Sequence, residues 1–454
     1  MADLDVLSRE ELVALAKELW ESNQLLQSEV SALRAESERL KKDPPSGIAR
    51  AVPSFVKPTR PAKPKRPKKK RPHSYVRHRE EPTKITEHAV EECPDCGRKL
   101  FGGWVHRVRQ VIEIPVIRYE VIEHRFLRCR CGVCGKNYVA SADLSGEVIG
   151  KHRIGVRLMS LLVYLKQSCR MPVRSIQRLM KSLWGLHLSI GEIAEALHAA
   201  ARFGQGVYEA LKEKVRGSPF VHGDETGWRE DGKNHWLWSF CTPEARLFVM
   251  DKSRGQAVPP RVLGERYGGI VVSDFLSAYS YHLGLHQRCW VHYLRDLKAL
   301  SEGRPKDMGV QQWVRDVRDL YDEAKAFRSD KRGERVRARE QFQERLYALA
   351  LPYAKRECPQ RLLAQRITRF VQEMFTFVEH PDIPSDNNPA ERALRPAVIY
   401  RKVCGGTRSE KGSATAATLM SLVGTWSLNG QDPLTACIQM LGAGSGIQSL
   451  SHQP

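Results

Sequence analysis

The chain has 454 residues, of which 41% are hydrophobic, and its 73 basic residues outnumber 52 acidic ones to give a formal net charge of +21. This composition fits a folded protein of two or three domains, and the basic excess favours a polyanionic partner over a merely solvated basic surface. The most apolar run, residues 158–165, is far shorter than the ~20 residues of a membrane span, and the acidic N-terminus lacks signal-peptide features. We therefore expect a cytoplasmic protein without a membrane partner, whose cysteines bind metal or are buried.

A leucine heptad opens the chain. The leucines recur at seven-residue spacing at Leu12, Leu19, Leu26, Leu33 and Leu40. This spacing predicts a coiled coil over residues 1–42, and Asn23 at a core position favours a parallel homodimer. The alternative is one amphipathic helix that packs on its own chain.

A basic, proline-rich stretch follows over residues 43–86. Residues 43–84 contain nine prolines and thirteen basic against three acidic residues. Such a segment cannot bury a core, so we expect an extended tether that binds DNA phosphates without reading sequence, or else a solubilising linker. The candidate phosphate contacts are Lys68, Lys69, Lys70 and Arg71.

Two Cys-x-x-Cys-Gly motifs mark residues 87–143 as a zinc ribbon. The four predicted ligands of one structural Zn²⁺ are Cys93, Cys96, Cys131 and Cys134. Cys129 either replaces Cys131 as a ligand or is a spare thiol. Apolar alternation over residues 105–122, interrupted by Pro115, predicts two short strands or an edge strand. This unit is expected to bind DNA or to act as a scaffold.

Residues 144–216 carry helical signals. Residues 173–182 predict one helix, Gly185 lies in a turn, and Ser189 with Glu192 predicts a capping box that starts the next helix. This is the layout of a helix-turn-helix, although two packed helices without a DNA role give the same pattern. The candidate DNA contacts on the first helix are Arg174 and Arg178.

The pattern then changes to strands. Five apolar runs predict strands at 219–228, 235–242, 246–251, 269–274 and 286–291, and a charged helical stretch follows over 295–380. Asp224 lies inside the first run and Asp274 closes the fourth. Acids in buried strands are costly unless they are paired or bind metal, and carboxylates at such strand ends suit Mg²⁺ on an RNase H-like sheet. The alternative for Asp274 is a cap on the following helix.

A third acid lies in the run Ser385-Asp-Asn-Asn-Pro-Ala-Glu-Arg-Ala-Leu-Arg-Pro396. Pro389 fits the first turn of a helix, and Glu391 falls in the same turn. Alone, this Glu could simply interact with the helix dipole. With Asp224 and Asp274 it completes a strand, strand and helix set of carboxylates.

These segments resemble the transposases of insertion-sequence family sixty-six. The matching residues are 224–228, 232–238, 273–274 with 278–279, 289–292 with 294–297, 386–396, and 402 with 405–409. The resemblance implies a DDE transposase with Asp224, Asp274 and Glu391 as catalytic ligands of two Mg²⁺ (or Mn²⁺) ions. It also implies metal-dependent cleavage of the element's terminal repeats and strand transfer into target DNA, with accessory transposition proteins as further partners and a nucleoid-associated location.

The expected fold class is α/β: an RNase H-like catalytic core with a helical insertion, preceded by a coiled coil, a zinc ribbon and a helical DNA-binding region. The expected parts are 1–42, 43–86, 87–143, 144–216, a catalytic domain over 217–405 with its insertion at about 296–380, and C-terminal helices over 406–454. The rival interpretations are an RNase H-like structure-specific nuclease without strand transfer, and an inactive zinc-dependent DNA-binding regulator.

Two further groups of residues are expected around the acids. The candidates to grip DNA phosphates next to the scissile bond are Arg392, Arg395, Arg401 and Lys402, for which ordinary surface charge is the alternative. The candidates to support the metal ligands from behind are Cys289, His292, Asn387 and Asn388. A zinc site at Cys289 and His292 is the alternative for that pair.

Overall fold

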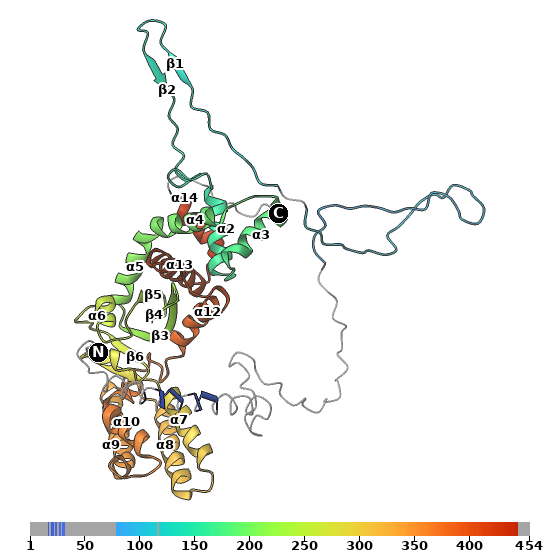
Figure 1. The fold of residues 1–454 in the computed structure, drawn as a ribbon. Coiled ribbons are helices and arrows are strands. Elements are labelled where there is room, and N and C mark those ends of the chain that lie inside the picture. The colour runs from blue at the N-terminus through green and yellow to red at the C-terminus, as the bar shows by residue number, and fades with distance from the viewer. Residues whose placement is uncertain are drawn as a thin grey trace. The chain divides into compact units, whose positions relative to one another are not determined.

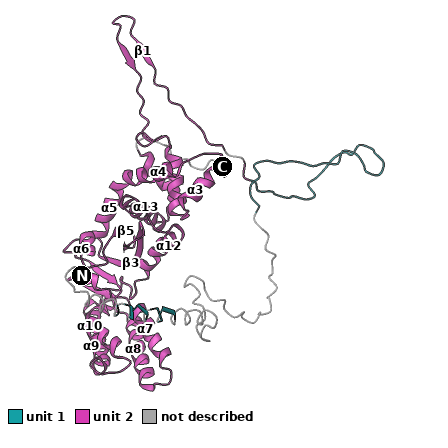
Figure 2. Cartoon of the chain, viewed as in Figure 1, with its two compact units in different colours: residues 1–113 teal, residues 114–454 magenta. Residues whose placement is uncertain are grey.

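The computed structural model describes residues 79–115, residues 118–443 and a few residues between Lys17 and Ser31. It comprises two units, residues 1–113 and residues 114–454 (Figure 2). The five heptad leucines and the basic run Lys68 to Arg71 lie outside the described residues, so the coiled coil and the tether stay predictions. Within the described part, no helix is both long and apolar enough to cross a membrane.

The predicted strands over residues 105–122 are wrong, because the structure assigns no strand to the described residues of that range. Instead, β1 (Arg128–Arg130) and β2 (Asn137–Val139) form a short antiparallel hairpin. Apolar side chains of the predicted run, such as Ile112, are exposed. Alternating apolar residues are typical of a strand that buries one face against another layer. Among the described residues, no such layer covers the apolar side chains of this run.

Four helices follow the hairpin: α2 (Val156–Gln167), α3 (Val173–Trp184), α4 (Ile190–Phe203) and α5 (Gln205–Arg216). The predicted helix, turn and helix are confirmed as α3 and α4. Gly185 ends α3 with a φ of +69°, a backbone conformation that favours glycine. Ser189 and Glu192 form the predicted capping box at the start of α4.

All five predicted strands are present in one sheet (Figure 1). They are β3 (Phe220–Glu230), β4 (Lys233–Cys241), β5 (Arg246–Asp251), β6 (Ile270–Ser273) and β7 (His286–Arg288). The order across the sheet is β5-β4-β3-β6-β7. The first three strands are antiparallel neighbours, whereas β6 runs parallel to β3 and β7 runs parallel to β6.

Helices cover both faces of this sheet (Figure 1). Side chains alternate along each strand, so Val221 of β3 packs with α5 and α6 (Val258–Leu263), whereas Trp228 packs on the other face. That second face is covered by α12 (Asn388–Cys404) and α13 (Glu410–Leu428). Even-numbered residues of β3, Asp224 among them, therefore share a face with α12.

The charged stretch predicted to be helical over residues 295–380 is helical in the structure, and its first helix begins at Trp290, five residues before the predicted start. Its helices are α7 (Trp290–Gly303), α8 (Met308–Ala326), α9 (Arg332–Ala354), α10 (Arg361–Phe370), η3 (Val371–Glu373) and α11 (Thr376–Glu379). They enclose a hydrophobic core of their own around Trp290, Trp313 and Phe375. After α13, the last described helix is α14 (Pro433–Gly442), which packs on α2.

Candidate active site

The structure places the three predicted acids on elements that meet at one edge of the sheet. Asp224 lies within β3, Asp274 follows the last residue of β6, and Glu391 lies in the first turn of α12. Because β3 and β6 are parallel and hydrogen-bonded from Phe220 to His222, their carboxyl ends point the same way. The helix α12 packs against β3, which brings Glu391 to the same side.

The three carboxylates interact electrostatically. Burial, and after it the negative charges of Glu225, Asp274 and Glu391, together raise the pKa of Asp224 to about 8, although a hydrogen bond from the Glu225 N–H acts in the opposite direction. A carboxyl that is crowded by other acids and holds its proton near neutral pH lacks a cation partner. This electrostatic environment is what a divalent-cation site has when the cation is absent.

Asp274 has a second role, in its own loop. Its Oδ1 accepts a hydrogen bond from the Leu276 N–H at 2.9 Å, just before the short helix η2 (Ser277–Tyr281). This contact closes a turn and does not cap η2, which has no side-chain cap, so the alternative interpretation of Asp274 as a cap on the following helix is wrong. One carboxylate oxygen is used in this way, which leaves the other for a ligand.

Glu391 faces His292, which the sequence placed among the supporting residues. The His292 Nε2 lies 3.7 Å from the Glu391 Oε1, and that oxygen is buried without a hydrogen-bond partner in the described chain. A buried carboxylate oxygen without a donor is costly. A bound cation would satisfy this oxygen, so its environment suits a positively charged ligand.

Asn387 fastens the loop before α12 to the strand that carries Asp224. Its side chain is fully buried; Nδ2 donates to the Gly223 carbonyl at 2.7 Å, and Oδ1 lies 3.1 Å from His222 Nδ1. Its backbone N–H donates to the Cys289 Sγ at 3.2 Å. Cys289 is thus a buried structural acceptor, and burial raises the pKa of its thiol. Asn388 instead closes a turn on the carboxylate of Asp386.

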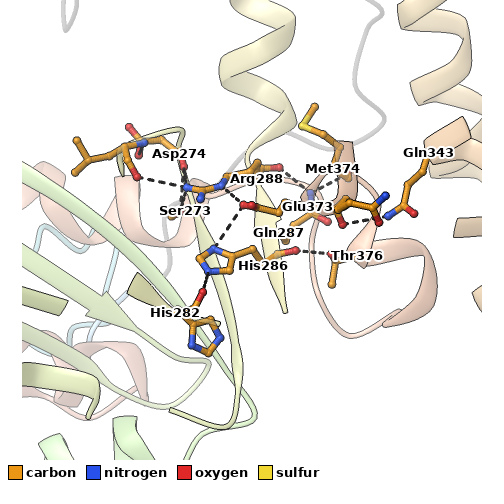
Figure 3. A network of polar contacts seen from close by, with 12 residues as sticks. Ser273, Asp274, His282, His286, Gln287, Arg288, Gln343, Glu373, Met374 and Thr376 are labelled. Carbon is orange, nitrogen blue, oxygen red and sulfur yellow. Dashed lines mark hydrogen bonds and ion pairs between the residues drawn. The ribbon is translucent and has the colours of Figure 1, made fainter. Parts of the chain in front are cut away.

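A buried arginine holds the Asp274 loop from the other side (Figure 3). Arg288, the last residue of β7, is 1% exposed. Its Nη1 donates to the Asp274 carbonyl at 2.8 Å and to the Ser273 hydroxyl at 3.2 Å, while its Nε donates to Glu373. Glu373 lies at the end of η3, so the arginine connects the helical insertion to the Asp274 loop.

The insertion also contacts the loop that leads to Glu391. The Trp290 N–H donates to the Ser385 carbonyl at 2.9 Å, and the Tyr321 hydroxyl lies 3.0 Å from the Ser385 hydroxyl. Both Trp290 and Tyr321 belong to the core of the insertion. The insertion therefore braces two of the three acidic segments.

Three residues of this site are absent from the sequence predictions. Arg288 and Glu373 form the brace just described. Glu225 follows Asp224 on the opposite face of β3, where its side chain is 1% exposed and bonded to Arg254 at 2.8 Å. The sequence signal that could have indicated these residues is a charged side chain inside an apolar strand, as in residues 224–225 and at Arg288.

The predicted basic residues on α12 have different environments. Arg392 and Arg395 are exposed, as expected of groups that grip phosphates. Arg401 instead donates to the Gly227 carbonyl of β3, so it serves the fold. On α3, Arg174 and Arg178 are both exposed, and Arg178 reaches only the Ser175 hydroxyl.

The two cysteine motifs adopt the same turn. Gly97 donates its N–H to the Cys93 carbonyl and Gly135 donates to the Cys131 carbonyl, with φ of +69° and +67°. Backbone N–H groups from within each turn lower the pKa of Cys93 and of Cys131. Each turn thus presents a cysteine pair as zinc knuckles do. Cys129 lies on β1 opposite Tyr138 and is exposed.

Across the described ranges, no three His, Cys, Asp or Glu side chains are gathered closely enough to hold one metal ion. The acidic cluster nevertheless has the donor chemistry for Mg²⁺, which prefers carboxylate oxygens and keeps several of its waters. Burial and the neighbouring acids raise the pKa of Asp224, and the buried Glu391 Oε1 has no hydrogen-bond partner among the described residues. The residues present therefore fit such an ion.

Comparison with known proteins assigns the class. The family described as "Transposase IS66 family" matches residues 151–415, which include all three acids, the sheet and the insertion. The chain therefore belongs to the IS66 family of transposases. It is also similar to a protein of Sinorhizobium fredii named "Uncharacterized protein y4jO", with 33% identity over 160 residues. That stretch is 34% of this chain and 47% of the relative, so the chain spans about half the length of that curated protein.

Proposed function

We propose that this transposase cuts DNA at the ends of its element and joins those ends to target DNA by phosphoryl transfer at Asp224, Asp274 and Glu391. The observation that carries the proposal is that these acids lie on β3, after β6 and on α12, and that the charges of Asp274 and Glu391 both act on the pKa of Asp224. The strand order with three antiparallel strands followed by two parallel ones supports an RNase H-like core. The brace through Arg288 and Ser385 supports a site that must be held rigidly.

Asp224, Asp274 and Glu391 would hold two Mg²⁺ or Mn²⁺ ions, which supply activation of the attacking oxygen and stabilisation of the leaving oxygen. The chain's own groups do the remaining work. Asn387 fixes the distance between the Glu391 helix and β3, and His292 orients the Glu391 carboxylate. The exposed Arg392 and Arg395 bind phosphates next to the scissile bond.

The two cysteine turns would hold one structural Zn²⁺ through Cys93, Cys96, Cys131 and Cys134. Their matching backbone turns and the lowered pKa of Cys93 and Cys131 support thiolate ligation. With α3 and α4, this unit would bind the terminal repeats. The coiled coil would pair two chains, so that both ends of an element are held together.

A strand-transfer assay tests the proposal against a nuclease. The substrate is the end of the element that encodes the chain, supplied with its 3′ end already cut, and the second DNA is a supercoiled plasmid. A transposase joins the 3′ hydroxyl to the plasmid in the presence of Mg²⁺, whereas a nuclease only nicks it. Joining that persists in Glu391→Gln would reject the assigned site.

A further inference from the structure

Two cavities adjoin on the face of the sheet that carries Asp224. The first, of about 360 Å³, is lined by Phe220 and His222 of β3, by Pro243 and Arg246 around the β4–β5 turn, and by Arg392. The second, of about 240 Å³, is lined by residues of α12 and α13 and by the loop between α2 and α3. Arg246 lines both cavities, so they are neighbours along α12.

Their position connects them to the active site. His222 precedes Asp224 by two residues and so points to the same face of β3, and its ring lies against Asn387. Arg392 directly follows Glu391 in α12. The first cavity therefore begins one strand position away from the acids, and the second extends from it along α12.

Guanidinium groups are distributed over both cavities. They belong to Arg392, Arg246 and Arg170. In the described part of the chain, none of the three has a carboxylate partner within salt-bridge distance. Arginines without acidic partners beside a cavity suit phosphate groups.

The second cavity also has buried polar atoms with no partner in the described structure. They are the Gln167 Oε1, the Ser168 Oγ and the Arg170 Nε, and all three residues line the cavity. Gln167 is only 8% exposed. Buried polar atoms normally find a partner, so an acceptor, a hydroxyl and a charged donor left unpaired together indicate a polar ligand that supplies both donors and acceptors.

The walls between the polar groups are apolar. Phe220, Pro243 and Pro384 line the first cavity, and Phe248 and Tyr400 line the second. A DNA duplex presents phosphates on its outside while its bases are stacked inside, so its bases cannot contact the apolar walls of a cavity. An unpaired strand exposes bases that stack on such surfaces, with phosphates between them.

We infer that the two cavities bind successive nucleotides of an unpaired DNA strand, with Arg392, Arg246 and Arg170 on its phosphates. The inference rests on the proposed function, because the inference specifies the form of the DNA that lies next to the acids. The first cavity lies near the lower end of the ~300–1,000 Å³ range of ligand sites and the second, of about 240 Å³, lies just below it, which suits one nucleotide apiece. The element's end would thus be unpaired where it enters the active site.

Binding measurements on the full chain in EDTA test this without any cleavage. The probes are a fluorescent DNA hairpin with a short single-stranded 3′ tail and the same hairpin with a blunt end. The wild-type chain should bind the tailed probe about tenfold more tightly, a difference that stacked bases and contacted phosphates supply. Equal affinity for both probes would overturn the inference.

Two variants locate the effect. Arg246→Gln should remove most of the preference for the tail and lower the salt-dependence slope on the tailed probe by about 0.7. Ser427→Tyr places a ring in the second cavity from an exposed position, and should remove the preference without unfolding the chain. The control Arg318→Gln removes an exposed arginine of α8 and should leave the preference intact. The inference is contradicted if both cavity variants still prefer the tailed probe. It is also contradicted if the variants lose affinity for the blunt probe as much as for the tailed probe.

The outcomes separate this inference from the proposed function. Asp224→Asn should keep the wild-type preference, since the measurement needs no metal and no chemistry. A tail preference that depends on Arg246, in a chain that cuts no element end, would reject the transposase site alone. Cleavage of element ends by a chain whose cavity variants still prefer the tail would reject the cavity assignment alone.

Discussion

Arg288 donates a hydrogen bond from its Nη1 to the main-chain oxygen of Asp274 at 2.8 Å, and this contact couples the segment that carries a proposed catalytic acid to the α7–α11 helices (Figure 3). The same guanidinium binds Glu373 through its Nε. Asp274 is therefore positioned partly by a helix of the insertion, far from it in the sequence. The insertion is thus part of the framework of the proposed active site.

Replacing Glu373 with Gln should slow cleavage and strand transfer about tenfold. The change leaves Arg288 buried without its carboxylate, so the free energy of unfolding should also fall by about 3 kcal/mol. Turnover at saturating Mg²⁺ and thermal unfolding measure the two effects. The matched control is Glu379→Gln, which breaks the ion pair with Arg339 inside the same insertion. It should lower stability without slowing turnover; equal slowing by both variants would show that only general stability matters.

Asp224 should make the metal-free protein less stable as pH rises. Its pKa is raised from 3.8 to about 8 in the folded chain, so the folded state retains a proton that the unfolded state loses. Between about pH 4 and pH 8 stability therefore falls with increasing pH, whereas below pH 4 both states are protonated and nothing is lost. Asp224→Asn should remove this slope. Thermal unfolding in EDTA at pH 5 and pH 8 measures it.

The prediction for Asp224 is contradicted if wild type and Asp224→Asn differ in stability by the same amount at pH 5 and at pH 8. Mg²⁺ gives a second check at pH 8. It should raise the melting temperature of the wild type and have a smaller effect on the variant, because a ligand that binds only the folded state stabilises it.

Asn387→Ala should disconnect α12 from β3. The substitution leaves the Gly223 carbonyl and the His222 ring without their buried partner, which costs about 1–3 kcal/mol for each unsatisfied group. Cleavage should fall more steeply than stability, since the relative position of Asp224 and Glu391 depends on this residue. The control is Asn429→Ala, which loses an exposed bond to the Glu244 carbonyl. If the control slows cleavage as much, Asn387 has no special positioning role.

The zinc assignment predicts one Zn²⁺ per chain in the purified protein. Cys96→Ser or Cys134→Ser should reduce the metal content measured by atomic emission, because each removes one of four thiolate ligands. Cys129→Ser distinguishes the spare thiol from a ligand, and it should leave the metal content unchanged. A full complement of zinc in both of the first two variants contradicts the assignment.

The strands could be predicted, and the three acids chosen as candidates, because their signals are local. The third and fourth apolar runs end at Asp251 and Asp274, and Glu391 stands in a recognisable motif after a helix-starting proline. The brace of Arg288 and Glu373 could not be predicted in this way, since 84 residues separate the pair and no local pattern joins them. The wrong strands at 105–122 show the converse, because alternation there has no covering layer among the described residues.

The most direct test of the central claim is metal-dependent cleavage of element ends by the full chain, with wild type compared with Asp224→Asn, Asp274→Asn and Glu391→Gln. A gel that resolves nicked from intact ends measures the product, and filter binding measures DNA affinity in parallel. The proposed site predicts that each variant loses cleavage in Mg²⁺ by at least a hundredfold, on the order of other losses of catalytic groups, while DNA binding is kept. Wild-type cleavage by any of the three variants would contradict the claim.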